Sequence, residues 1–331
     1  MAEPTQRPAR PMTLVIGAVV ALVVVAAAAV LAGTSEGAQT PGDDQYVEIA
    51  DVAQTITPKV TENGSSGQYT IRCGSNAERH LNADNPVMSP GTPAGAHHTH
   101  EYVGNSSADY TSTDDSLEKA KSTCDKDLSS YFWPVLRLTD GVGHDAHAPG
   151  GGEHGNTGEV VPPKSVTITY VGNPASKVLP MPRFLRMITG DPMALTHQYG
   201  DRVRAKWSCS GHQDRYTTKY PLCENGESVV RSYEFASCWD GGNIDSASHR
   251  THIVHPSAAG ICPARTFPVP QLRLTVTYDV PKGRPFAIDS FPEQHRDPAS
   301  DHAMYINVMP AAMMNELVRC INEGRSCSSA R

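Results

Sequence analysis

The sequence predicts a mainly β protein, either a β-sandwich or a distorted barrel, with long loops, a few peripheral helices and disulfide bonds. Three observations predict it: apolar and polar residues alternate in several segments, 27 glycines and 26 prolines favour turns, and eight cysteines are present. The 331 residues suffice for one large domain or two ordinary ones. One apolar N-terminal helix is expected in addition.

The strands are predicted from a period of two in the apolar residues. In residues 165–171, the apolar side chains share one face and threonines take the other. Residues 202–209 and 271–280 alternate in the same way, and residues 228–239 form a further candidate. Such segments are half-buried strands with one solvated face. No internal repeat is visible.

Two helices are predicted beside these strands. Residues 116–124 favour a helix, with Asp114 or Asp115 as its N-terminal cap. Residues 310–323 begin with a proline and stop before Gly324, which are the residue types typical of a helix start and end.

A glycine-rich stretch, residues 140–164, precedes the first of the predicted strands. Its glycines give it no reason to hold one conformation, so we expect a flexible surface insertion. The alternative is a loose metal site formed by its three histidines, His144, His147 and His154.

The N-terminus predicts export. Residues 12–33 are uncharged and apolar, long enough to cross a hydrocarbon core of about 30 Å as a helix. Arg7 and Arg10 precede them, which places the N-terminus in the cytoplasm and the bulk of the chain across the membrane. The segment is either an uncleaved anchor or a signal peptide cleaved near Ala32. Both alternatives place the protein outside the cell or at its surface.

Four segments follow from this interpretation. They are a cytoplasmic region (1–11), the signal peptide or transmembrane anchor (12–33), a flexible linker with a short helix near 47–54 (34–68), and the extracellular domain (69–331).

The charge balance argues against nucleic acid as a partner. Lysine and arginine total 28, aspartate and glutamate total 35, and the formal net charge is −7. No block of basic residues is present to form a nucleic-acid-binding face. The expected partners are a membrane, through the N-terminal helix, and cell-wall glycan.

All eight cysteines follow the apolar segment, and an even number in an exported domain predicts disulfides. No CxxC pair is present, so a structural zinc knuckle is not expected. Closeness along the chain favours three pairs and leaves a fourth: Cys209–Cys223, Cys238–Cys262, Cys320–Cys327 and Cys73–Cys124.

Two short runs hold six of the 14 histidines. In the first run, an extended backbone places His98 and His100 on one face. In the second, His249 and His252 are three residues apart, as in a helical turn or a tight loop. We expect the fold to bring these four imidazoles together in one polar pocket.

Three chemistries suit such a pocket. Histidines can act as general acid or base, oriented by an aspartate, and the candidate catalytic residues are His98, His100, Asp240, His249 and His252. The same four histidines could instead hold a divalent Zn or Cu ion, completed by Asp240. A glycan-binding cleft would add polar and aromatic substrate contacts from Asn105, Trp239, Asp245, His302 and Asn307. The alternative without a site is that each histidine only stabilises its own loop.

Familiar catalytic motifs are absent. The sequence contains no HExxH, no GxSxG nucleophile elbow, no P-loop and no GxGxxG.

Several blocks carry a resemblance to a known family. "GAHHTHEYVGN" from Gly95 and "CWDGGNIDSASHRTHIVHP" from Cys238 are the most specific, and "SSYFWPVL", "LRMITGDP" and "SDHAMYIN" agree with them in order. Over about residues 70–327 the chain resembles DUF1996, a secreted family of unknown function from fungi and actinobacteria. The resemblance implies secretion, and fungal relatives with sugar-binding modules point to cell-wall polysaccharide.

One block departs from the family pattern. Met304 stands where the family carries an aspartate, and Met309 stands where it carries a tryptophan. If that aspartate is catalytic in relatives, this chain has an altered or inactive site.

The function expected from the sequence is an extracellular enzyme, a hydrolase or lyase acting on cell-wall or environmental polysaccharide. The first alternative is a histidine-rich protein that binds Zn or Cu. The second is a non-catalytic module that binds or builds the cell wall.

Overall fold

The computed structural model describes residues 40–140 and 154–329. The predicted apolar segment, 12–33, lies outside the described residues, as do His144 and His147. Within the described part of the chain, no helix combines the length and apolar character needed to cross a membrane.

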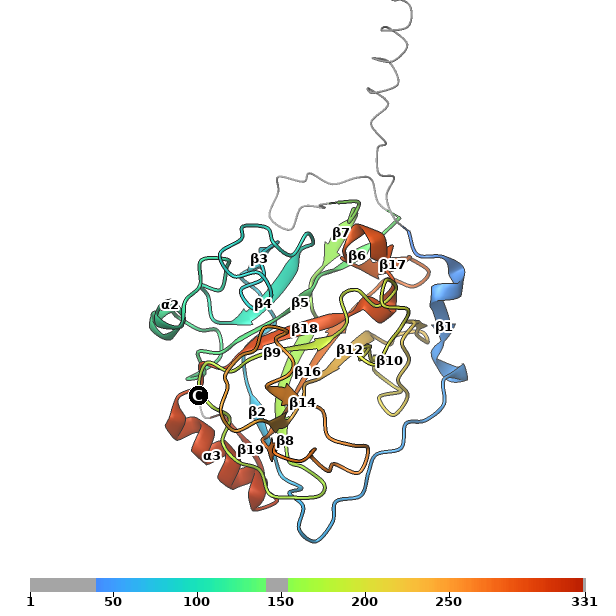
Figure 1. Cartoon of the computed structure of the whole chain (residues 1–331). Coiled ribbons are helices and arrows are strands. Elements are labelled where there is room, and N and C mark those ends of the chain that lie inside the picture. The colour runs from blue at the N-terminus through green and yellow to red at the C-terminus, as the bar shows by residue number, and fades with distance from the viewer. Residues whose placement is uncertain (1–39, 141–153, 330–331) are drawn as a thin grey trace, which may run out of the picture. The chain divides into compact units, whose positions relative to one another are not determined.

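Two large sheets form the body of the fold (Figure 1). The six-stranded sheet has the order β10 (Trp207–Cys209), β12 (Val229–Glu234), β16 (Gln271–Tyr278), β8 (Ser165–Val171), β2 (Gln68–Ile71) and β19 (Ser326–Ser328). The five-stranded sheet has the order β3 (Leu81–Asn82), β4 (His100–Gly104), β5 (Ser130–Pro134), β18 (His302–Ile306) and β9 (Arg186–Gly190).

The main hydrophobic core joins these two sheets. Ile168 and Leu274 of the six-stranded sheet share it with Val103, Trp133 and Tyr305 of the five-stranded sheet. Burial alternates along β8 and β16, as the period of two predicted. The prediction of a mainly β, disulfide-stabilised fold is therefore confirmed.

Three small sheets flank the body. They consist of the parallel pair β1 (Tyr46–Glu48) and β11 (Tyr220–Leu222), of β14 (Ile253–Val254), β13 (Cys238–Trp239) and β15 (Phe267–Pro268), and of β17 (Phe286–Ile288), β6 (Leu136–Leu138) and β7 (Glu159–Val161). The strand expected over 228–239 is therefore two strands in different sheets.

The helices differ from the prediction in their bounds. Helix α2 is Asp114–Lys119, and its cap is Thr113, whose hydroxyl accepts from the amide of Ser116. The two expected caps are therefore the first helical residues, and their carboxylates still favour the positive end of the helix. Helix α3 is Ala311–Asn322, close to the expected range.

Four short 3₁₀ helices complete the secondary structure: η1 (Asp43–Gln45), η2 (Ile49–Asp51), η3 (Pro292–Gln294) and η4 (Pro298–Ser300). The short helix expected near 47–54 is present as the three-residue 3₁₀ helix η2, which follows the end of β1. The segment expected to be a linker also packs on the body: β1 pairs with β11, and the Tyr46 hydroxyl donates to the carbonyl of Phe286 at 2.7 Å.

All four predicted disulfides are present. They join Cys73–Cys124, Cys209–Cys223, Cys238–Cys262 and Cys320–Cys327. Three close loops of 24 residues or fewer, and the fourth links residues 51 positions apart. These bonds tie loops and the C-terminal strand to the sheets.

A buried ion pair connects the two large sheets. Arg231 of β12 lies 2.6 Å from Asp301, the residue before β18, and both side chains are almost fully buried. The same guanidinium donates to the carbonyl of Pro134 on β5 at 2.7 Å. One side chain of the six-stranded sheet therefore holds two strands of the other sheet.

We predict that Arg231→Gln lowers the free energy of unfolding by about 3–5 kcal/mol, because Asp301 stays buried without its partner. Arg273→Gln is the control, since Arg273 is partly exposed and its ion pair with Glu234 is 3.5 Å long. Its expected effect is below about 1 kcal/mol. Urea unfolding measures both, and equal effects would contradict the assignment.

Candidate metal centre

One transverse row of the five-stranded sheet carries the candidate site. Backbone pairing places Asn82 opposite His100, His100 opposite Pro134, and His302 opposite Gly190. Met304 pairs with Phe132, so the same register brings His302 opposite Pro134. Two histidines therefore flank a proline in one row, each on a strand next to β5.

His98 completes the cluster from the chain just before β4. Its Nε2 atom lies 3.1 Å from the Nε2 atom of His100 and 3.3 Å from that of His302. Within the described residues, these three form a group whose ligand atoms all lie within 4.8 Å of one another. All three side chains are buried.

Hydrogen bonds fix the orientation of two of the rings. Nδ1 of His100 contacts the carbonyl of Asp84 at 2.8 Å, and Nδ1 of His302 contacts that of Ser300 at 2.9 Å. A carbonyl only accepts, so each Nδ1 carries the proton and each neutral ring directs a lone pair from Nε2 into the cluster. His98 can donate to only one of these two nitrogens, which leaves a lone pair without a partner.

The cluster is neutral around pH 7. Burial lowers the pKa of His100 to about 3, and the neighbouring His302 adds to the effect. Burial likewise lowers the pKa of His302 to about 4, although its bond to Ser300 opposes the shift. The pKa of His98 also lies well below its usual value, because of burial and then because of His100 and His302. Neutral imidazoles are the form that binds a metal.

Two of the three nitrogen–nitrogen distances in the cluster have the spacing expected around a metal ion. Zinc–nitrogen bonds of 2.0–2.1 Å in a tetrahedral arrangement separate the ligand nitrogens by about 3.3 Å. The contacts of His98, at 3.1 and 3.3 Å, match this spacing. Histidine ligands held through Nδ1 by carbonyl groups are also the usual second-shell arrangement.

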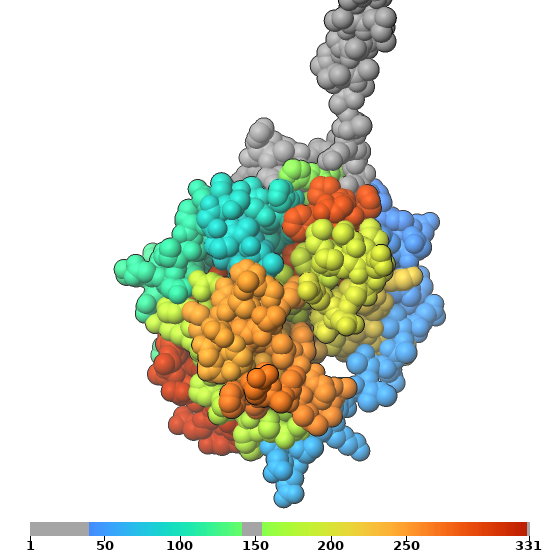
Figure 2. Space-filling model, viewed as in Figure 1, coloured from blue at the N-terminus to red at the C-terminus, as the bar shows by residue number. Residues whose placement is uncertain are grey.

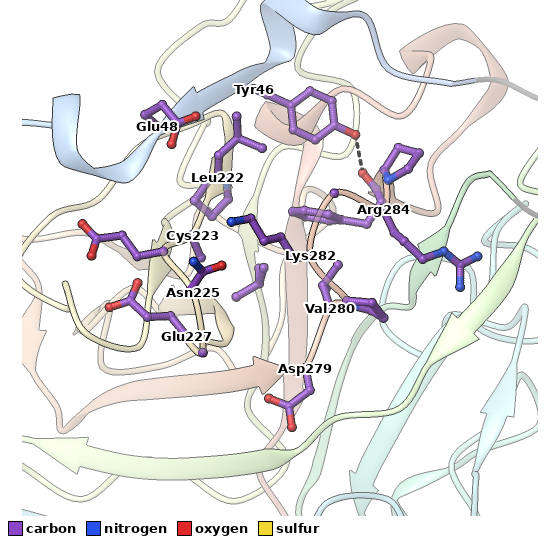
Figure 3. A pocket seen from close by; sticks show the side chains of 18 of the residues that line it. Tyr46, Glu48, Leu222, Cys223, Asn225, Glu227, Asp279, Val280, Lys282 and Arg284 are labelled. Atoms are coloured by element: carbon purple, nitrogen blue, oxygen red, sulfur yellow. Dashed lines mark hydrogen bonds between the residues drawn. The ribbon is translucent and has the colours of Figure 1, made fainter.

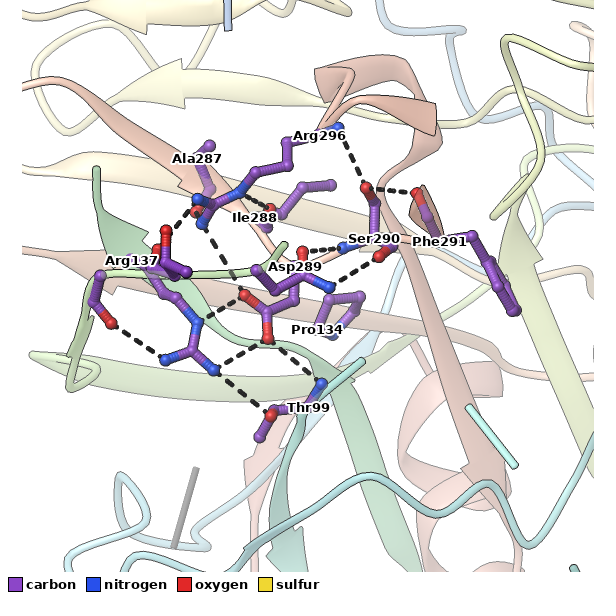
Figure 4. A network of polar contacts seen from close by, with 12 residues as sticks. Thr99, Pro134, Arg137, Ala287, Ile288, Asp289, Ser290, Phe291 and Arg296 are labelled. Carbon is purple, nitrogen blue, oxygen red and sulfur yellow. Dashed lines mark hydrogen bonds and ion pairs between the residues drawn. The ribbon is translucent and has the colours of Figure 1, made fainter. Parts of the chain in front are cut away.

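A buried polar network holds the segment between His98 and His100 (Figure 4). The amide of Thr99 donates to Asp289 at 3.2 Å, and Arg137 binds both carboxylate oxygens of Asp289 at 2.6 and 2.9 Å. Arg296 approaches the same carboxylate at 3.8 Å. The carboxylate thus fixes the extended backbone that places two histidines of the site.

Aromatic rings surround His98 on its other side. The ring of Phe291 lies 5.1 Å from that of His98 and 5.8 Å from that of His97. His97 in turn lies 5.3 Å from His154, and both of these histidines are exposed. Phe291 thus separates the buried cluster from the exposed pair.

The structure does not bring the second histidine run into the cluster. His249 lies with Nδ1 2.8 Å from Asp245. His252 uses both ring nitrogens elsewhere, on the hydroxyl of Ser246 at 2.9 Å and the carbonyl of Arg186 at 2.7 Å. Arg186 and Gly190 are the two ends of β9, about 13 Å apart. The expected convergence of four histidines is therefore wrong, and His302 takes the place of His249 and His252.

The second run instead covers the edge strand β9. The amide of Arg186 donates to the carbonyl of Ile244, Nε2 of His252 donates to the carbonyl of Arg186, and Arg250 donates to the carbonyl of Gly190. Edge strands expose unpaired backbone groups, and this loop partners such groups at both ends of the strand.

The other residues expected at a site serve their own loops. Asp240 accepts from the amides of Gly242 and Asn243, and Trp239 donates to the carbonyl of Asn243. The amide groups of Asn105 and Asn307 donate to main-chain carbonyls of Leu117, Leu128 and Pro182. None of these contacts reaches the three histidines.

Met304 lies two residues along β18 from His302, on the same face. It packs in a second, smaller core with Tyr102, Phe132 and Ile188. This position therefore contributes no carboxylate to the cluster. Met309 is buried in the main core.

Sequence reasoning missed the groups that support the site. Arg137 is an isolated charge inside an apolar segment, and that was the signal available, because a charge in a buried strand needs a partner. Asp289 and Asp301 lie next to strands in more polar stretches, which give no such signal. A second group of potential ligands in the described chain, at Cys209, Cys223 and Glu227, contains a disulfide and offers no thiolate.

The model of a domain of unknown function, DUF1996, matches residues 85–307. The chain belongs to the DUF1996 family. The matched region contains His98, His100 and His302, and it also contains Asp289. No curated protein and no solved structure matches the chain.

A large cavity lies at another place on this DUF1996 protein (Figure 3). It measures about 1210 Å³ and lies between β1, β11 and the turn at 279–286. Tyr46, Leu222 and Phe286 supply apolar surface, and acidic and basic side chains of both signs surround them. No histidine of the cluster lines it.

We predict that acid destabilises the metal-free protein between pH 6.5 and about 4.5. In this range the three histidines are protonated when unfolded but stay neutral when folded, so each lowers the free energy of unfolding as the pH falls. Glu101 opposes one of them, because burial raises its pKa to about 7 and it takes up its proton earlier in the folded state.

Urea unfolding in the presence of a chelator, at pH 6.5, 5.5 and 4.5, measures this effect. His302→Gln is expected to reduce the pH dependence by about one proton. A pH dependence that is unchanged in this variant would show that His302 is already protonated in the folded state.

Proposed function

We propose that this protein binds one transition-metal ion, Zn or Cu, through the Nε2 atoms of His98, His100 and His302. The observation that carries the proposal is the convergence of three neutral, buried imidazole nitrogens within 4.8 Å. A metal ion would accept the lone pairs of all three Nε2 atoms at once. Without a metal, the protons of three neutral rings cannot satisfy all three nitrogens, and one lone pair stays without a partner.

The ligand type supports these two metals. Imidazole nitrogens suit Zn and Cu, whereas Mg and Ca prefer oxygen ligands. Three protein ligands leave a coordination position for water or a substrate, as in catalytic zinc sites. We infer that the centre supports chemistry and does not only staple the fold, because four disulfides already serve that purpose among the described residues.

We further propose that the folded part lies outside the cytoplasm, either anchored or secreted. The four disulfides support an oxidising compartment. The apolar run at 12–33 is consistent with export. Action on a glycan stays a prediction from the sequence.

Metal analysis tests the central proposal. The full-length protein, purified in mild detergent, is stripped with a chelator, loaded with Zn²⁺ or Cu²⁺ and dialysed. We expect one retained ion per chain, and an affinity reduced by about 100-fold or more in His98→Ala and His302→Gln, since even second-shell changes cost 10- to 100-fold.

His249→Gln is the matched control, because His249 is a partly buried histidine bonded to Asp245 and outside the cluster. It is expected to retain the ion with unchanged affinity. Stoichiometric metal that persists in both cluster variants, or is lost in the control, would refute the proposed centre.

A further inference from the structure

Arg250 lies at the end of the row that carries the histidines. Its guanidinium donates to the carbonyl of Gly190 at 2.7 Å, and Gly190 pairs with His302. Neighbouring strands lie about 5 Å apart, so the guanidinium is within roughly 10 Å of the His302 backbone.

Gly190 permits the close approach of β9 to β18. Its φ is +83°, and an added Cβ would lie 2.2 Å from the carbonyl oxygen of Asp301 and 2.8 Å from Cα of His302. A side chain at this position would therefore push β9 away from β18. With glycine, no side chain on β9 stands between His302 and Arg250.

Arg250 also differs from Arg137 and Arg231 in its partners. Arg137 and Arg231 each bind an aspartate, at 2.6 Å. Within 40–140 and 154–329, Arg250 makes no ion pair with a carboxylate, and its bond to Gly190 is to a neutral carbonyl. A partly buried guanidinium with unused N–H donors is a receptor for a planar or tetrahedral oxyanion.

The residues around Arg250 leave its positive charge available to bind an anion. The acidic side chain that acts on Arg250 is Asp191, which accepts a hydrogen bond from His197 at 2.8 Å when Nδ1 carries the proton. Arg202 and Arg204 add positive charge nearby, and together with burial they lower the pKa of Arg250. Figure 2 shows the segments near 85–100 in cyan, 191–205 in yellow-green and 240–255 in orange on one face of the molecule.

We propose that Arg250 binds an oxyanion group of a ligand at the β9 edge of the five-stranded sheet, at the end of the row that carries the histidines. The ligand class is a molecule bearing a carboxylate, phosphate or sulfate, which the guanidinium holds by its anion. This inference does not rest on the proposed function, because the anion contact belongs to Arg250 itself.

Calorimetry with inorganic phosphate, sulfate and acetate tests the anion contact on the full-length, Zn²⁺-loaded protein. Saturable binding of at least one anion is expected, and the preferred probe identifies the oxyanion. Arg250→Gln should weaken the affinity for this anion tenfold or more, and Arg250→Lys should weaken it less. The exposed control Arg202→Gln should change the affinity less than threefold. Equal affinity in wild type and Arg250→Gln, or no binding of any probe to wild type, would overturn the proposal.

A second measurement avoids any variant that fails to fold. Phenylglyoxal modifies accessible arginines, and mass spectrometry reports the extent at Arg250 in wild type with and without the preferred anion. Protection of Arg250 but not of Arg202 supports the contact, and equal modification contradicts it. Metal content measured on the same samples separates the two proposals, since anion protection without bound metal would refute only the histidine centre.

Discussion

Two buried guanidinium–carboxylate pairs hold the segments on which the rest of this structure depends. Asp289, bound by Arg137, accepts from the amide of Thr99, which lies between two histidines of the cluster. Asp301, bound by Arg231, directly precedes His302. Buried pairs add little to stability by themselves, but a missing partner is costly, so each pair fixes one geometry. That geometry brings imidazoles separated by about 200 residues to within hydrogen-bonding distance.

The dry environment then decides the chemistry of the cluster. Burial makes protonated imidazole unfavourable, and the carbonyls of Asp84 and Ser300 assign the proton of each neutral ring to Nδ1. Three Nε2 atoms therefore face a common point, with at most one proton between them. Without a cation, this arrangement leaves a buried nitrogen without a hydrogen-bond partner, which is unfavourable. A cation bound by three nitrogen ligands would satisfy all of them.

The second histidine-rich run contacts the edge of the five-stranded sheet, at the end of the row that carries the cluster. Its loop provides hydrogen-bond partners for the backbone of the edge strand β9. His252, which the sequence suggested as a ligand, therefore stabilises the edge of the sheet instead. The same loop delivers Arg250 to Gly190, next to His302. A positive charge beside a neutral histidine cluster favours an anionic ligand over a neutral glycan.

The sequence alone determined the local features, because each depends on residues close together in the chain. The alternation in β8 and β16, helix α3, the three short-range disulfides and the pairing of His98 with His100 belong to this class. The tertiary structure alone decided which third histidine joins them. His249 and His252 have the denser motif, yet strand register places His302 beside Pro134 and His100, and that register depends on long-range pairing that no local pattern encodes.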